Sequence, residues 1–135
     1  MGSEMCIRDS LNTIHTLKTG TLIAASLVLP LLLLNRSTEE MNAMESFAYQ
    51  LGLLFQIVDD ILDATGTQAS LGKTANKDAL QNKLTYVSLF GLSEAQNMAE
   101  KVAKQAKEKL EFFKAKHSDI TLLTGFIDHI LTRQS

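Results

Sequence analysis

A long helical pattern of apolar residues from Met41 to Ala64 constrains this chain more than any other feature. Apolar side chains recur there at steps of three and four residues, which is the spacing of one face of an α-helix: Met41, Met44, Ala48, Leu51, Phe55, Val58 and Leu62. Other faces are apolar too, at Leu53, Leu54, Ile57 and Ile61. At ~1.5 Å per residue such a helix is about 40 Å long, and we expect it inside a bundle.

The limits of this helix are marked by polar residues. Ser37 precedes Glu40 by three residues, a spacing that predicts a capping box at the start of the helix. Thr65-Gly66 is expected to end it, and the polar, glycine-containing segment 65–77 is expected to form a loop.

An earlier helix is expected from Leu11 to about Leu29, interrupted at 18–20 by the polar residues Lys-Thr-Gly. Pro30 is expected to bend or end this helix. The apolar run 21–34 is shorter than the ~20 apolar residues of a membrane span, and it contains Pro30 and polar residues. We therefore expect a buried core helix and no membrane span.

The remaining sequence also predicts helices. Asp78 is expected to cap a helix that ends at Gly91, Ser93 and Gln96 to open the next one, and a last helix to start near Ser118. These helices are expected to bury Met98, Val102, Ala106, Leu110 and Phe113, and then Leu122, Leu123, Phe126, Ile127, Ile130 and Leu131. No stretch shows the two-residue period of a strand. We predict an all-α helical bundle.

Charge and cysteine content exclude some classes of function. The net charge of −2 provides no basic surface of the kind that binds nucleic acid. The single cysteine, Cys6, excludes a disulfide framework and fits the reducing cytoplasm. Residues 1–10 show no periodicity and no apolar signal-peptide core, so we expect them to be a leader or an artefact outside the fold, which then covers 11–135.

Three carboxylates interrupt the apolar helix in the segment Phe55–Asp63 (FQIVDDILD). Asp59, Asp60 and Asp63 lie within one turn of each other, with Gln56 one turn before Asp59, and we expect all four side chains to project toward one side. Carboxylates this close repel each other, and burying them unpaired is costly. Mg²⁺, which prefers oxygen ligands and shares its coordination with water and phosphate, is the natural counter-ion.

The alternative is that these aspartates mark a solvated helix end. The helix dipole disfavours negative charge at a C-terminus, which argues mildly for a functional role. An EF-hand is excluded because residue 61 is Ile, and a di-iron bundle is excluded because no Glu-x-x-His sequence occurs.

Basic residues that suit a phosphate ligand lie on both sides of the aspartates. Lys73, Lys77 and Lys83 follow them, and His15 and Lys18 precede them. Lysines bind phosphate as point charges. Residues 1–68 carry three basic and eight acidic side chains, and residues 69–135 carry ten and seven, a division compatible with joining cations to an anionic ligand. Each lysine alone is more typical of a solvated surface.

Four segments in this order resemble the trans-isoprenyl diphosphate synthases, the farnesyl and geranylgeranyl diphosphate synthase family. They are HTLKTG (15–20), LGLLFQIVDDILD (51–63), LGKTANKD (71–78) and NKLTY (82–86). They resemble that family's KTG block, second aspartate-rich motif, basic loop and following lysine block, and the bacterial short-chain branch is most similar in form.

The resemblance implies a magnesium-dependent prenyltransferase that joins an allylic diphosphate to isopentenyl diphosphate. Asp59, Asp60 and Asp63 would be the metal ligands. Lys18, Lys73 and Lys83 would hold the allylic diphosphate, Thr19 and Gln56 would face the developing carbocation, and Phe55 would line the prenyl pocket.

The resemblance covers the C-terminal half of such an enzyme. The family's first aspartate cluster and its isopentenyl diphosphate site lie in the other half, so we expect residues 11–135 to be inactive alone and to belong to a homodimer when complete. A half-bundle is also expected to expose apolar faces. The family resemblance leaves open a non-catalytic helical partner subunit of a prenyl synthase. Terpene cyclases share the fold, but their Asn/Asp–Ser/Thr–Glu motif is missing here.

Overall fold

A computed structural model describes residues 2–69 and 84–133 of the chain. Within these ranges every regular element is a helix: α1 (Gly2–His15), the π-helical turn η1 (Thr16–Gly20), α2 (Thr21–Leu33), α3 (Thr38–Ala69), α5 (Tyr86–Phe90), α6 (Leu92–Ala115) and α7 (Thr121–Thr132). The all-α prediction is confirmed.

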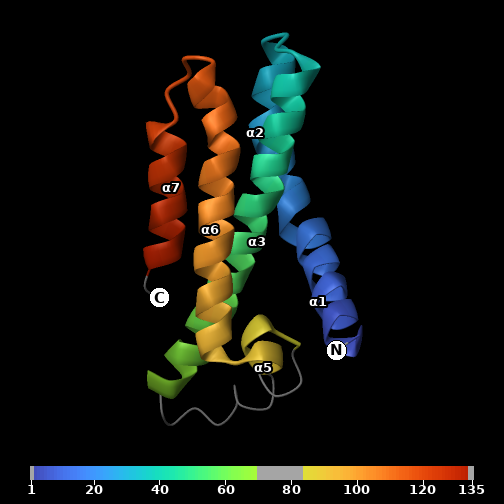
Figure 1. Cartoon of the computed structure of the whole chain (residues 1–135), viewed down its shortest axis with the longest axis vertical. Helices are drawn as coiled ribbons and strands as arrows, with labels where there is room; N and C mark the ends of the chain where they lie inside the picture. The colour runs from blue at the N-terminus through green and yellow to red at the C-terminus, as the bar shows by residue number, and fades with distance from the viewer. Residues whose placement is uncertain (1, 70–83, 134–135) are drawn as a thin grey trace.

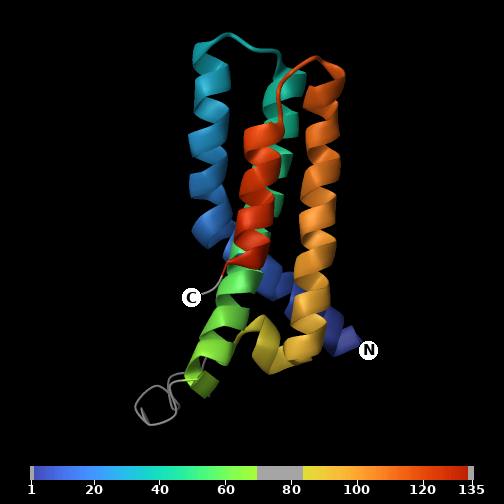
Figure 2. The same ribbon diagram turned by 90° about the vertical axis from the view of Figure 1, so that its left-hand side faces the viewer.

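Helix α3 is the centre of the bundle, since it contacts every other element described. Helices α2, α6 and α7 run alongside it, and α1 leans away from the bundle at the end where α5 lies (Figures 1 and 2). The α2–α3 and α6–α7 connections both lie at the opposite end. The second half of α3, which carries the aspartates, therefore reaches toward α5.

The interior position predicted for α3 is confirmed by its side chains. Phe47, Leu54 and Ile57 are fully buried, against Leu110 of α6 and Ile127 of α7 among others. Burying a side chain of this size contributes about 1.5–3 kcal/mol. Packing rather than local helix propensity therefore holds this 32-residue helix in place.

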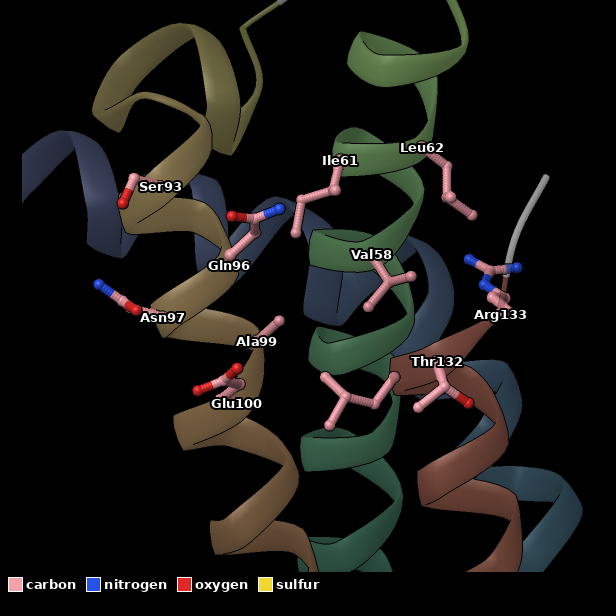
Figure 3. A pocket seen from close by; sticks show the side chains of 11 residues that line it. Val58, Ile61, Leu62, Ser93, Gln96, Asn97, Ala99, Glu100, Thr132 and Arg133 are labelled. Carbon is pink, nitrogen blue, oxygen red and sulfur yellow. The ribbon is translucent and has the colours of Figure 1, made fainter.

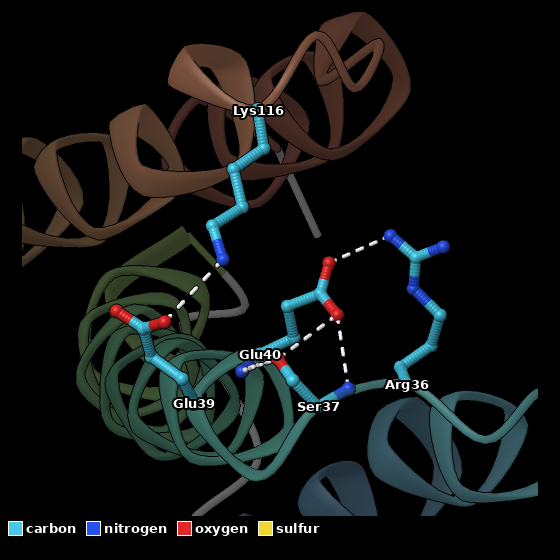
Figure 4. Close-up of polar contacts among 5 residues, drawn as sticks. All are labelled: Arg36, Ser37, Glu39, Glu40 and Lys116. Atoms are coloured by element: carbon cyan, nitrogen blue, oxygen red, sulfur yellow. Dashed lines mark hydrogen bonds and ion pairs between the residues drawn. The ribbon is translucent and has the colours of Figure 1, made fainter.

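The capping box predicted at the start of α3 is confirmed (Figure 4). The Glu40 amide donates to Ser37 Oγ at 3.2 Å, and the Ser37 amide donates to Glu40 Oε2 at 3.0 Å. Arg36 adds an ion pair to Glu40 Oε1 at 2.6 Å. First the Arg36 hydrogen bond and then the Ser37 amide lower the pKa of Glu40 from 4.5 to about 2.

Replacing Glu40 by glutamine is expected to lower the free energy of unfolding at neutral pH. Since the pKa of Glu40 is lower in the folded chain, its stabilisation is present above pH 4.5 and is lost as the pH falls toward about 2. The difference between wild type and Glu40→Gln should therefore shrink over that interval in urea unfolding curves. Glu39→Gln, which removes only an exposed pair with Lys116 at 3.4 Å, is the control and should change little. A Glu40→Gln effect independent of pH would contradict this assignment.

Two predicted helix ends are wrong. Helix α3 continues past Gly66 to Ala69, and the Thr65 hydroxyl donates to the Ile61 carbonyl at 2.9 Å within it. Helix α2 continues through Pro30 to Leu33. The Leu34 amide donates to the Pro30 carbonyl at 3.0 Å, so the helical hydrogen bonding continues beyond the proline although Pro30 itself has no N–H to donate.

The predicted helix start at Asp78 lies outside the described residues, and the predicted start of the next helix at Ser93 is wrong. Helix α5 begins at Tyr86 after Thr85, which is extended (φ −127°, ψ 166°) and shares a capping box with Ser88. Helix α6 begins at Leu92 after Gly91, whose φ of 86° favours glycine, and Ser93 makes no cap.

The last helix, α7, also differs from its prediction. It starts at Thr121 and buries Ile127 and Ile130, whereas Leu122 and Phe126 are exposed. The apolar pattern of α7 is therefore wider than the surface that α3 and α6 cover. In α6, by contrast, Val102, Ala106, Leu110 and Phe113 are buried as predicted, and Met98 is partly buried.

The apolar run 21–34 is predicted from its sequence to form a buried core helix, and this prediction is wrong for the described chain. In α2 only Ala24 is buried, whereas these leucines, with Leu17 before them, are exposed: Leu22, Leu29, Leu32, Leu33 and Leu34. Exposed apolar faces are what the sequence predicts for part of a larger bundle. In the described part of the chain, one run, Cys6–Leu33, is long and apolar enough by length and composition to cross a membrane. Core helices of soluble proteins pass the same test, so this is weak evidence, and the absence of a span stays a prediction.

Residues 1–10 were expected to lie outside the fold. Helix α1 begins at Gly2 and passes through Ser10 without a break. Arg8 stacks on the Phe90 ring of α5 at 4.7 Å, so this segment makes a tertiary contact. Its origin as a leader stays a prediction.

Candidate functional site

The aspartate-bearing part of α3 has two differently oriented sets of polar side chains. Asp59 and Asp63 follow Gly52 by seven and eleven residues, about two and three full turns, so the three residues align along one line of the helix. Gln56 and Asp60 lie to one side of that line and are buried. Phe55 lies to the other side, toward α7.

Asp59 is held by a cation from the end of α7. The guanidinium of Arg133 forms an ion pair with Asp59 Oδ1. The same guanidinium lies 4.3 Å from the centre of the Phe55 ring and donates to the Phe55 carbonyl at 3.4 Å. Asp59 is still partly open, since 38% of its side chain is exposed.

Asp60 points into the bundle toward α5. Its Oδ2 accepts a hydrogen bond from the Tyr86 amide at 3.1 Å, and its Oδ1 accepts one from Gln56 Nε2 at 3.2 Å. Only 2% of Asp60 is exposed. Burial, and then the charge of Asp60, raise the pKa of Tyr86. The carboxylate thus ties α3 to the first turn of α5.

The four polar side chains that are predicted to project toward one side therefore have different surroundings. Asp59 meets α7, Asp60 and Gln56 meet the interior beside α5, and Asp63 is exposed. No group of three metal-binding side chains occurs in the ranges that the structure describes. Residues i and i+1 differ by about 100° around a helix, which is why neighbouring aspartates separate.

The turn η1 brings the predicted Lys18 and Thr19 toward the same line of α3. A Cβ atom built on Gly52 would lie 2.9 Å from the Gly20 Cα, so the two backbones touch where η1 crosses α3. That crossing is about one turn before Gln56 and two turns before Asp59. Lys18 is exposed and Thr19 partly buried. Single π-helical turns inside helices are frequent at functional sites.

Two of the predicted substrate-binding residues, Lys73 and Lys83, lie outside the described residues. The structure adds Arg133, which sequence reasoning missed. Its partner Asp59 is 74 residues away in the chain, and no spacing rule links them. The only available signal was a cation placed directly after an amphipathic helix.

A cavity of about 510 Å³ lies beside this site, between α3, α6 and α7 (Figure 3). Val58, Ile61 and Leu62 form its α3 wall, Gln96 and Glu100 belong to its α6 wall, and Arg133 lies at its edge. In the described part of the chain, its lining includes none of the three aspartates. The cavity and the Asp59–Asp63 face are thus on different sides of α3, with Arg133 between them.

Known proteins are similar to this chain both in sequence and in their fold. The sequence model described as polyprenyl synthetase matches residues 3–120. The chain belongs to the polyprenyl synthetase family. It is 41% identical over 127 residues to geranylgeranyl pyrophosphate synthase 7, chloroplastic, of Arabidopsis thaliana, covering 94% of this chain and 36% of that protein.

Other members of the polyprenyl synthetase family are similarly close. The dimethylallyltranstransferase of Fischerella ambigua (strain UTEX 1903) is 40% identical over 124 residues, which are 92% of this chain and 35% of that protein. The crystal structure of a geranyltransferase from Helicobacter pylori 26695 superposes with a TM-score of 0.67 at 28% identity, covering 91% of this chain and 38% of that one. The chain spans about a third of the length of these relatives.

Proposed function

We propose that this chain is the C-terminal part of a prenyl diphosphate synthase that condenses an allylic diphosphate with isopentenyl diphosphate to form farnesyl or geranylgeranyl diphosphate. One observation carries the proposal. Asp59 and Asp63 lie in line with Gly52, where the turn bearing Lys18 and Thr19 touches α3. This supports the proposal, because the turn that bears Lys18 and Thr19 contacts the same helix that carries the carboxylates, although the two segments are far apart in sequence.

The donors on this face fit Mg²⁺. Asp59, which is partly exposed, and Asp63, which is exposed, supply carboxylate oxygens along one line of α3, and Mg²⁺ is usually bound by one or two carboxylates together with water and phosphate oxygens. We propose these two residues as the metal ligands. Asp60, predicted as a third ligand, has both oxygens engaged inside the bundle, and we propose that it orients Gln56 and α5 instead.

The other side chains have roles that follow from their positions. Bound Mg²⁺ would stabilise the negative charge that develops on the departing diphosphate. Lys18, with Lys73 and Lys83, would add positive charge around that diphosphate. Gln56 donates its amide N–H to Asp60, and its carbonyl oxygen would face the developing carbocation. Phe55 would line the prenyl pocket, and the Thr19 oxygen would face the cation with Gln56.

The family's activity needs more than this segment. The exposed apolar faces of α1, α2 and α7 and the one-third coverage of the relatives support a chain that works within a larger bundle. We propose that it has no prenyltransferase activity alone, and that the complete enzyme is a cytoplasmic homodimer.

A chimera tests this function directly. Residues of this chain would replace the matching segment of the Fischerella ambigua dimethylallyltranstransferase, to which they are 40% identical. The folded chimera should form prenyl diphosphates from labelled isopentenyl diphosphate, an allylic diphosphate and Mg²⁺, whereas the isolated chain should form none. A chimera with a native circular dichroism spectrum and no product would contradict the proposal and favour a non-catalytic partner subunit. Product from the isolated chain would contradict its predicted inactivity.

A further inference from the structure

We propose that Arg133 is a positioning residue that competes with the divalent cation for Asp59 and thereby sets the metal affinity of that carboxylate. This inference rests on the proposed function, because it takes Asp59 as a metal ligand. It adds a residue to which no sequence motif assigns a role.

Three contacts hold the Arg133 side chain on the metal-binding face. Its guanidinium pairs with Asp59, stacks on the Phe55 ring at 4.3 Å and donates to the Phe55 carbonyl at 3.4 Å. Both α3 partners belong to the aspartate-rich segment. The end of α7 thus places a positive charge directly beside one of the two carboxylates proposed to bind metal.

The pair also matters for charge balance. Asp59, Asp60 and Asp63 lie within five residues of one helix, and arginine stays protonated throughout the physiological range. A guanidinium at Asp59 therefore reduces the repulsion among these carboxylates when no metal is bound. A divalent cation at the same carboxylate has the same sign of charge as Arg133, so the two ions oppose each other's binding.

The Arg133 guanidinium group does not use all of its hydrogen-bond donors in the described part of the chain. Arg133 Nε is buried and has no hydrogen-bond partner in the described part of the chain. A buried donor without a partner is unfavourable, and a small movement of the side chain toward solvent would relieve it. The Arg133–Asp59 contact is therefore suited to release when a metal arrives.

Titration of the full 135-residue chain with Mn²⁺, followed by the loss of the free-ion EPR signal, tests this competition. Arg133→Met removes the charge and keeps an unbranched apolar stem for the Phe55 ring. The expected result is Mn²⁺ binding about three- to tenfold tighter than in wild type, since a partly exposed ion pair no longer competes. Arg133→Lys, which keeps the charge, should bind more weakly than Arg133→Met.

A matched control separates this local effect from a change of net charge. Lys107→Met removes one positive charge from the exposed pair with Asp128, at 2.5 Å between α6 and α7, and should leave Mn²⁺ affinity within about twofold of wild type. Unchanged, weaker or undetectable Mn²⁺ binding in folded Arg133→Met would overturn the competition.

A metal-free measurement checks the contact itself. Unfolding of the Arg133→Met, Asp59→Asn and double variants should give a non-additive coupling, because each substitution removes the same pair. Additive effects would overturn the contact on which the proposal depends. Failure of the proposed function is detected separately, by a folded chimera without product, and does not depend on either of these readouts.

Discussion

Replacing Asp59 by alanine in the active chimera is expected to lower kcat by about a thousandfold. The reason is that a metal ligand contributes several kcal/mol to stabilising transition-state charge, and each 1.4 kcal/mol corresponds to about a factor of ten in rate. Asp59 is partly exposed and its Oδ1 is paired with Arg133, so its loss should change folding far less than turnover. Initial rates with labelled isopentenyl diphosphate at saturating Mg²⁺ measure the effect.

The control for this variant is an aspartate of similar exposure away from α3. Asp128→Ala removes a side chain that pairs with Lys107 on the outside of the bundle, and its kcat should stay within about twofold of the chimera. Asp59→Asn keeps the shape of the residue and should lose most of the rate as well. A near-normal rate in both Asp59 variants would remove Asp59 from the catalytic machinery.

Replacing Asp60 by alanine is expected to destabilise the chain by about 2–6 kcal/mol. Asp60 is almost completely buried, and its removal leaves the Tyr86 amide and Gln56 Nε2 without their acceptor, each at a cost of about 1–3 kcal/mol. Because whole domains are stable by only about 5–15 kcal/mol, this is the largest stability effect that we expect among the polar residues of the site. Urea unfolding of the 135-residue chain measures it.

Asparagine at position 60 separates anchoring from metal binding. The Asn side-chain oxygen can still accept from the Tyr86 amide, and Gln56 can rotate its amide to accept from the new NH₂ group. Asp60→Asn should therefore retain most of the stability. In the chimera it should lose some turnover, because the rotated Gln56 no longer turns its carbonyl oxygen toward the carbocation, but far less than Asp59→Asn. A thousandfold loss of turnover with normal stability would instead support the ligand role that the sequence motif predicts for Asp60.

The all-α fold and the central helix could be predicted from the sequence because the patterns that determine them are local. An apolar period sustained over 41–64 leaves only a buried helix as a solution, and the Ser37–Glu40 box involves residues three apart in the chain. Local patterns of this kind determine local geometry. The end of α3 was predicted wrongly because Thr65 and Gly66 are weak stop signals, and the Thr65 hydroxyl bonds back to Ile61.

The site was harder to predict because its geometry depends on distant residues. Adjacent aspartates at 59 and 60 look equivalent in sequence, yet one meets Arg133 and the other meets Tyr86, 26 residues further along the chain. Which neighbour lies opposite each carboxylate is decided by how α5 and α7 pack on α3. The family resemblance predicts the type of reaction. The tertiary contacts are needed to decide which role each aspartate has.

The backbone contact between Gly20 and Gly52 limits which substitutions the candidate site can accept. Where two helices meet through side chains, rotamer changes can absorb a new methyl group, but here the backbones themselves touch, with 2.9 Å from a Cβ built on Gly52 to the Gly20 Cα. The separation between the turn that carries Lys18 and the helix that carries Asp59 is therefore determined by the main chain. A substitution that leaves the Gly20–Gly52 contact intact should therefore leave this separation unchanged.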